Sequence, residues 1–180
     1  MPLVFAVIGV ALLLVACTYT PDYPTKGVNG FWTDEPLLEQ AFNEAVQRLT
    51  DAGITAFAYV TLNVDKKGVP IKYSTSKAMV KQCNSKAKMN QGEYIAGCTS
   101  YSAHDGHVDA IYILEGTEYK SIVSHLTHEL IHVVLNLREH NPKDGGVFSR
   151  VAGLELTQSD LDWICKHSDC IDPHLPAPRI

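Results

Sequence analysis

The sequence predicts an α+β fold in which helices back a single sheet. Two long segments, residues 34–52 and 118–137, carry apolar residues at helical spacing. Four segments between them are rich in β-branched and aromatic residues, as strands are: residues 54–64, 69–74, 93–101 and 108–114. A shorter segment near the end predicts a closing helix at residues 157–167. Helices and strands that are grouped in this way are typical of the α+β class.

The first helix has a start signal and a stop signal. Thr33 or Asp34 can cap its first turn, which Pro36 suits. Its apolar face is made by residues three and four apart: Leu38, Ala41, Phe42, Ala45, Val46 and Leu49. Gly53 ends the helix. In the strand that follows, alternate residues predict one shared face: Ala58, Val60, Leu62 and Val64.

The middle of the chain carries weaker signals. Pro70 weakens the second strand, because proline cannot donate a ladder hydrogen bond. Residues 76–89 are rich in lysine and only weakly helical, and residues 104–107 form a loop between the last two strands. Thr157 can cap the closing helix, which packs through Leu161 and Ile164.

The chain begins with an uncharged apolar run at residues 3–16. This run is shorter than the about 20 residues that a membrane-spanning helix needs. It has the length of the apolar region of a secretory signal peptide. It ends in Leu-Val-Ala-Cys at residues 14–17, which resembles the lipobox of bacterial lipoproteins. The resemblance implies that residues 1–16 are a signal peptide and that Cys17 carries lipid.

The same resemblance implies an exported protein that is anchored to the cell envelope by its lipid. Thr18 follows the lipid cysteine where an aspartate retains many lipoproteins at the inner membrane. We therefore favour the outer membrane if the host is Gram-negative. Residues 17–30 contain prolines, glycines and polar residues and predict a lipidated tether. Residues 31–180 then form one catalytic-type domain of ordinary size.

Charge limits the partners that this domain can have. The formal net charge at pH 7 is −5, with both signs interspersed along the chain. This composition indicates no nucleic-acid partner and no surface for anionic lipids. We expect the domain to be a monomer.

Five cysteines leave four for disulfides if Cys17 is lipidated: Cys83, Cys98, Cys165 and Cys170. An even number in an exported chain indicates disulfides. Of the three pairings, we favour Cys83–Cys98 and Cys165–Cys170, because close partners require no assumption about tertiary contacts. No C-x-x-C pattern occurs, which argues against a zinc site made of cysteines.

The second long helix carries H-E-x-x-H at residues 128–132. Residues i and i+4 share one helix face, so His128 and His132 can present two imidazoles to one Zn²⁺ ion. Glu129 can take a proton from a zinc-bound water and pass it to the leaving amine. The alternative is an amphipathic helix with these residues by chance. Burying two histidines and a glutamate without a metal would be costly, which favours zinc.

The motif helix resembles the metzincin metalloproteases, and among them the matrixin-like ones of bacteria. Their pattern is H-E-x-x-H-x-x-G-x-x-H, where the glycine ends the helix and the third histidine binds zinc. Here Leu135 stands at the glycine position and Arg138 at the third histidine. An alternative alignment uses Asn136, which can adopt a left-handed conformation, to end the helix. The resemblance then implies that His140 is the third zinc ligand.

Two acidic residues compete with His140 for that role. Glu155 lies 23 residues after His132 and resembles the glutamate of the gluzincin arrangement, although it precedes a helix instead of lying on one. Asp144 is an aspartate option, but its neighbours match no known motif.

The metzincin resemblance extends beyond the motif. Residues 145–149, G-G-V-F-S, resemble the methionine turn beneath the zinc, with Phe148 in the methionine's place. The closing helix and the last two strands also resemble those of matrixins. The resemblance implies a mixed sheet backed by helices and an extended substrate that pairs with the strand before the motif helix.

Several other residues have two interpretations. His104, His107, Asp105 and Asp109 could bind a second metal, but we favour a solvated loop. His125 lies either near the site or at the surface. Three strand tyrosines predict packing in the sheet and not oxyanion donors: Tyr94, Tyr101 and Tyr112.

The sequence therefore predicts a lipid-anchored zinc metalloendopeptidase with Glu129 as its catalytic base. The alternative is a non-catalytic envelope lipoprotein that keeps a metzincin-like fold and serves as a binding module. Hydrolysis of a non-peptide bond in the cell wall is a third reading of the same motif.

Overall fold

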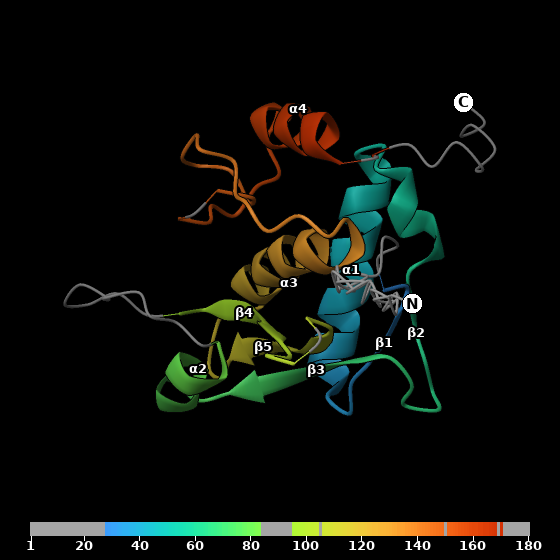
Figure 1. Ribbon diagram of the computed structural model, residues 1–180, viewed down its shortest axis with the longest axis vertical. Coiled ribbons are helices and arrows are strands. Elements are labelled where there is room, and N and C mark those ends of the chain that lie inside the picture. The colour runs from blue at the N-terminus through green and yellow to red at the C-terminus, as the bar shows by residue number, and fades with distance from the viewer. Residues whose placement is uncertain (1–27, 84–94, 105, 150, 169, 171–180) are drawn as a thin grey trace, which may run out of the picture.

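The computed structural model describes residues 28–83, 95–104, 106–149, 151–168 and 170, and its architecture is α+β, as predicted. Five strands form one mixed sheet, and the long helices α1 and α3 pack against it and against each other (Figure 1). The closing helix α4 lies beyond α3, on the side away from the sheet (Figure 1).

The sheet has the order β2-β1-β3-β5-β4. Its strands are β1 Gly30–Trp32, β2 Thr61–Leu62, β3 Val69–Ser74, β4 Gly97–Tyr101 and β5 Val108–Leu114. All neighbours are parallel except β4, which pairs antiparallel with β5 at one edge. Pro70 is tolerated in β3 because it lies beside β1, before the pairing of β3 with β5 begins at Ile71. Its missing N–H therefore leaves the β3–β5 ladder intact.

Helix α1, Pro36–Asp51, buries the apolar face that its sequence predicts, with five residues in the core: Leu38, Ala41, Phe42, Ala45 and Leu49. Gly53 adopts φ 84° and ends the helix as expected. The prediction of a side-chain cap from Thr33 or Asp34 is wrong, because Glu35 is the N-cap and makes no such bond. The Thr33 hydroxyl instead accepts from the Glu35 N–H at 3.2 Å.

The predicted strand at residues 54–64 is also wrong. Its first half is a 3₁₀ helix, Thr55–Tyr59, and only the two residues of β2 pair in the sheet. Phe57 is fully buried within this 3₁₀ helix, whereas Val64 is 100% exposed. Burial of one large aromatic ring beside α1 outweighs the alternating pattern that suggested a shared face.

The remaining elements follow the sequence more closely. Helix α2, Ser76–Gln82, is capped by the Thr75 side chain. The rest of the predicted lysine-rich helix falls among residues 84–94, outside the described residues. Helix α3 spans Tyr119–Val134. Helix α4, Gln158–His167, begins with a capping box in which Thr157 and Asp160 bond reciprocally.

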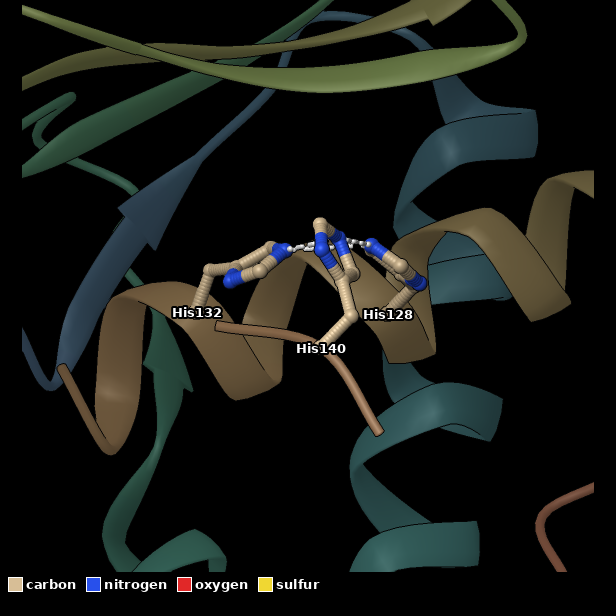
Figure 2. A group of neighbouring side chains, drawn as sticks. All are labelled: His128, His132 and His140. Atoms are coloured by element: carbon tan, nitrogen blue, oxygen red, sulfur yellow. Dashed lines mark hydrogen bonds between the residues drawn. The ribbon is translucent and has the colours of Figure 1, made fainter. Parts of the chain in front are cut away.

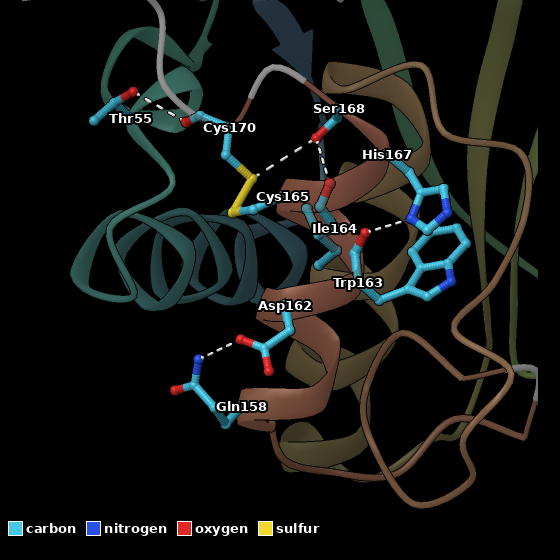
Figure 3. The surroundings of a disulfide bond; sticks show 9 residues. All are labelled: Thr55, Gln158, Asp162, Trp163, Ile164, Cys165, His167, Ser168 and Cys170. Atoms are coloured by element: carbon cyan, nitrogen blue, oxygen red, sulfur yellow. Dashed lines mark hydrogen bonds between the residues drawn. A yellow bond between two sulfur atoms is a disulfide. The ribbon is translucent and has the colours of Figure 1, made fainter.

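Both predicted disulfides form, Cys83–Cys98 and Cys165–Cys170. The first ties the end of α2 to β4. The second holds the segment after α4, where the Thr55 hydroxyl donates to the Cys170 carbonyl at 3.2 Å (Figure 3). Disulfides of this kind contribute about 2–4 kcal/mol each to stability, mainly by restricting the unfolded chain.

The predicted signal peptide and the lipid-bearing Cys17 lie outside the described residues, as does the tether up to residue 27. Within the described part of the chain, no helix is long and apolar enough to cross a membrane.

We expect Phe57→Ala to lower the free energy of unfolding by about 3–5 kcal/mol, because it empties a fully buried site. Val64→Ala is the matched control and should change it by less than about 0.5 kcal/mol. Urea unfolding of the purified variants measures both values. A larger loss in Val64→Ala than in Phe57→Ala would contradict the 3₁₀ assignment and favour the alternating strand, whose shared face includes Val64 and not Phe57.

Candidate metal centre

Three histidines converge on one point between α3 and the loop that follows it (Figure 2). The Nε2 atoms of His128 and His132 are 3.0 Å apart. The Nε2 atom of His140 lies 3.1 Å from that of His128 and 3.2 Å from that of His132. The predicted grouping of His140 with the two motif histidines is therefore confirmed, and these residues are placed to hold a metal ion.

Helix α3 supplies the first two histidines from one face. His128 and His132 are separated by four residues, and both are less than 10% exposed. Apolar side chains surround them along the same helix, including Leu126, Leu130 and Ile131, which are fully buried. The helix is thus held by its buried apolar side chains, and both histidine rings lie in its buried part.

A left-handed turn brings in the third histidine. Helix α3 ends at Val134, and Asn136 then adopts φ 52°. Asparagine tolerates this conformation better than other residues except glycine. The turn reverses the chain so that Leu137 is buried and His140 faces the helix that it has just left. The predicted role of Asn136 is confirmed.

The outer nitrogens of both helix histidines bond to backbone carbonyls. His128 Nδ1 lies 2.7 Å from the Val147 carbonyl oxygen, and His132 Nδ1 bonds to the Leu137 carbonyl. A carbonyl only accepts, so each Nδ1 carries a proton, and the neutral form of such a ring has its lone pair on Nε2. Burial, reinforced by His132, lowers the pKa of His128 to about 3, which keeps its ring neutral.

This donor set fits a divalent transition metal. Two lone pairs that face each other at 3.0 Å repel unless a cation lies between them. Nitrogen ligands in one tetrahedral shell are about 3.3 Å apart when the Zn–N bonds are about 2.0–2.1 Å. The observed separations of 3.0–3.2 Å are close to that value. The backbone carbonyls provide the outer bonds that metal-binding histidines usually make.

Phe148 lies against all three histidines. Its ring centroid is 5.3 Å from that of His128, 5.0 Å from that of His132 and 5.8 Å from that of His140. The ring is fully buried, and its centroid also lies 5.7 Å from that of the Trp163 ring of α4. Phe148 therefore fills the space between the histidine cluster and the closing helix.

Asn141 fixes the chain next to His140. Its side chain is 3% exposed and donates to Asp160 Oδ1 at 3.0 Å and to Ser159 Oγ at 3.2 Å. Its backbone N–H donates to the Phe148 carbonyl at 2.9 Å. Asp160 is itself fully buried and accepts from Thr157 at the start of α4. The loop that bears His140 is thus tied to α4 by a satisfied polar network.

Glu129 faces the edge strand β4. It is 5% exposed, and the Thr99 hydroxyl donates to its Oε2 at 2.7 Å. Tyr101 lies at the end of the same strand, and its pKa is raised above the ordinary value for tyrosine. Burial is the main cause and the Glu129 charge adds to it, whereas the Arg138 charge offsets part of the rise. The Arg138 guanidinium carbon lies 4.9 Å from the centre of the Tyr101 ring.

The competing ligands lie elsewhere. Glu155 and Asp144 are exposed, and neither belongs to the histidine group, which is the one candidate metal group among the described residues.

The other candidate residues do not form a second metal group among the described residues. His104, His107 and Asp109 are exposed and form no such group, whereas Asp105 and Tyr94 are outside the described residues. His125 is half-buried one turn before Glu129, and burial lowers its pKa.

Sequence reasoning missed several residues that shape this site. The carbonyls of Leu137 and Val147 have no sequence signal, because every residue has one. The sequence around Thr99 indicates a strand but does not indicate that its hydroxyl donates to Glu129. Asp160 was identifiable only as part of a helix cap, and its bond to Asn141 depends on tertiary contact.

A comparison of the sequence with models of known protein families found no match, and neither did a search of curated proteins.

We expect His140→Ala to weaken Zn²⁺ binding by more than about 100-fold, because loss of a ligand should cost more than the 10–100-fold typical of its supporting bonds. Glu155→Ala is the matched control and should bind Zn²⁺ as the wild type does. Metal content after loading and dialysis, followed by competition with a chelator, measures the affinities. The reverse pattern would make Glu155 the third ligand.

Asn141→Ala should weaken Zn²⁺ binding by about 10-fold, since it releases the loop next to His140 from α4. Asn29→Ala removes an exposed amide and serves as a control. The same chelator competition measures both variants. Unchanged affinity in Asn141→Ala would show that the loop is held by other contacts.

Proposed function

We propose that this protein is a zinc-dependent metalloendopeptidase that hydrolyses peptide bonds with Glu129 as general base. The observation that carries the proposal is the convergence of three histidine Nε2 atoms beside a buried carboxylate on the same helix. Catalytic zinc sites have three protein ligands and an open position, and three histidines form one such set.

Zinc suits this site better than a hard cation, because imidazole nitrogens favour Zn²⁺ over Mg²⁺ or Ca²⁺. His128, His132 and His140 would hold the ion. Bound there, zinc supplies Lewis-acid chemistry that makes water more acidic and polarises the scissile carbonyl.

The protein's own groups perform the proton transfers. Glu129 follows the first ligand in the sequence and is 5% exposed, so its carboxylate is held in place with little access for bulk water. It takes a proton from the attacking water and later delivers that proton to the nitrogen of the leaving amine. The carboxylate ends the cycle unchanged, so hydrolysis needs no co-reactant other than water.

Substrate binding is assigned to the edge strand β4. One side of β4 pairs with β5, and the other side is an edge of the sheet. Its backbone groups can pair with an extended peptide. Because the Thr99 side chain of β4 contacts Glu129, a peptide added to this edge would lie close to the catalytic carboxylate.

The resemblance to matrixin-like metzincins supports the same proposal. The third histidine follows a left-handed turn after the motif helix, and Phe148 lies against the ligands where the resemblance places a methionine. The closing helix packs behind Phe148 through Trp163. We propose on this basis that the protein is a metzincin relative with an altered spacing of its third ligand.

We further propose that the enzyme acts in the cell envelope, anchored through lipid on Cys17. The two disulfides support export, because such bonds persist in oxidising compartments. The substrate would then be a protein or peptide that reaches the same compartment.

Glu129→Gln should retain Zn²⁺ and lower kcat for peptide cleavage by about 100- to 10,000-fold, because it removes the general base but keeps the shape. The measurement is cleavage of a quenched fluorescent peptide library by zinc-loaded protein. Glu155→Gln, an exposed carboxylate, is the control. If the wild type binds zinc but cleaves nothing, the binding-module alternative gains, and a cell-wall substrate becomes the next to try.

A further inference from the structure

The edge strand β4 and the catalytic helix α3 meet through two residues of β4, Gly97 and Thr99. Alternate strand residues share a face: the Thr99 hydroxyl donates to Glu129, and Gly97 leaves room beside the same carboxylate. Cys98, between them, points the opposite way and is joined to Cys83 at the end of α2. Strand β4 is therefore fixed from behind while its front face touches the proposed catalytic base.

The hydrogen bond between Thr99 and Glu129 has only one direction. An ionised carboxylate accepts but cannot donate, so the Thr99 hydroxyl donates to Oε2, at 2.7 Å. A bond to a charged acceptor is about twice as strong as a neutral one. Because Glu129 is nearly buried, no bulk water competes for this contact. The bond thus restricts the rotation of the carboxylate about its last torsion.

The other carboxylate oxygen has a different environment. A Cβ atom at position 97 would lie 3.5 Å from Glu129 Oε1 and 3.1 Å from His125 Cβ. A side chain at position 97 would therefore be crowded by His125 and would lie in van der Waals contact with Oε1. Glycine leaves that space clear.

We propose that Thr99 is a positioning residue that assigns the two oxygens of Glu129 different roles, an inference that rests on the proposed peptidase function. Thr99 holds Oε2 as an acceptor, so Oε1 is the oxygen that takes the proton from the attacking water. The water O–H bond breaks as its oxygen bonds to the carbonyl carbon. The proton then passes from Oε1 to the leaving nitrogen as the C–N bond breaks, which restores the carboxylate.

The test compares three variants of the zinc-loaded protein. Thr99→Val keeps the branched shape but lacks the hydroxyl, and we expect kcat to fall by about 10- to 100-fold, as for a misplaced catalytic group. KM should change by less than about twofold and zinc content not at all, because Thr99 holds the base and not the ligands. Thr99→Ser restores the hydroxyl and should restore kcat to within about threefold of wild type. Ser100→Ala removes a neighbouring hydroxyl and is the control.

A second readout is independent of activity. In a double-mutant cycle on thermal unfolding, Thr99→Val should lower Tm more in the wild-type background than in Glu129→Ala, because the two side chains interact. Equal shifts in the two backgrounds would overturn the proposal, as would a Thr99→Ser variant no more active than Thr99→Val. If the wild type cleaves nothing, the peptidase function fails first. The catalytic role of Thr99 then falls with it, even where the coupling shows the contact.

Discussion

The lone pairs of His128 and His132 face each other at 3.0 Å inside a nearly dry site, and the Nε2 atom of His140 lies as close to both. Neutral imidazoles in this arrangement repel one another unless a cation is shared among them. Burial lowers the pKa of His128 to about 3, so this ring stays neutral at pH 7 and offers a lone pair at Nε2. The loop after α3 brings the third ring to this point.

Different elements of the fold hold the three histidines and Glu129 in place. For the histidines, backbone carbonyls of the loop accept hydrogen bonds from the Nδ1 atoms of His128 and His132, and Phe148 packs behind the rings. Asn141 and Asp160 tie that loop to α4, so the closing helix stabilises the third ligand although it contributes no metal ligand among the described residues. Glu129, in contrast, is held by strand β4 through the hydrogen bond from Thr99. The ligands and the base are thus positioned by different elements, which makes their effects separable by mutation.

The sequence could predict those features of the site that depend on residues close together in the chain, and it could not predict those that depend on tertiary contacts. The i, i+4 histidines, the disulfide pairs and the left-handed Asn136 are set by local chemistry, and all were predictable. The segment at residues 54–64 was not, because a buried Phe57 overrode the alternating pattern. The three-residue strand β1 is too short to give a pattern. Thr99 and the carbonyls of Leu137 and Val147 acquire their roles only through tertiary contact.

Anomalous scattering from a crystal of the zinc-loaded protein, measured on both sides of the zinc absorption edge, tests the metal centre most directly. We expect a single strong peak about 2.0–2.1 Å from the Nε2 atoms of His128, His132 and His140. A peak bound to only two of these histidines, or bound to Glu155, would contradict it. So would a crystal that was loaded with zinc and shows no peak among the three rings.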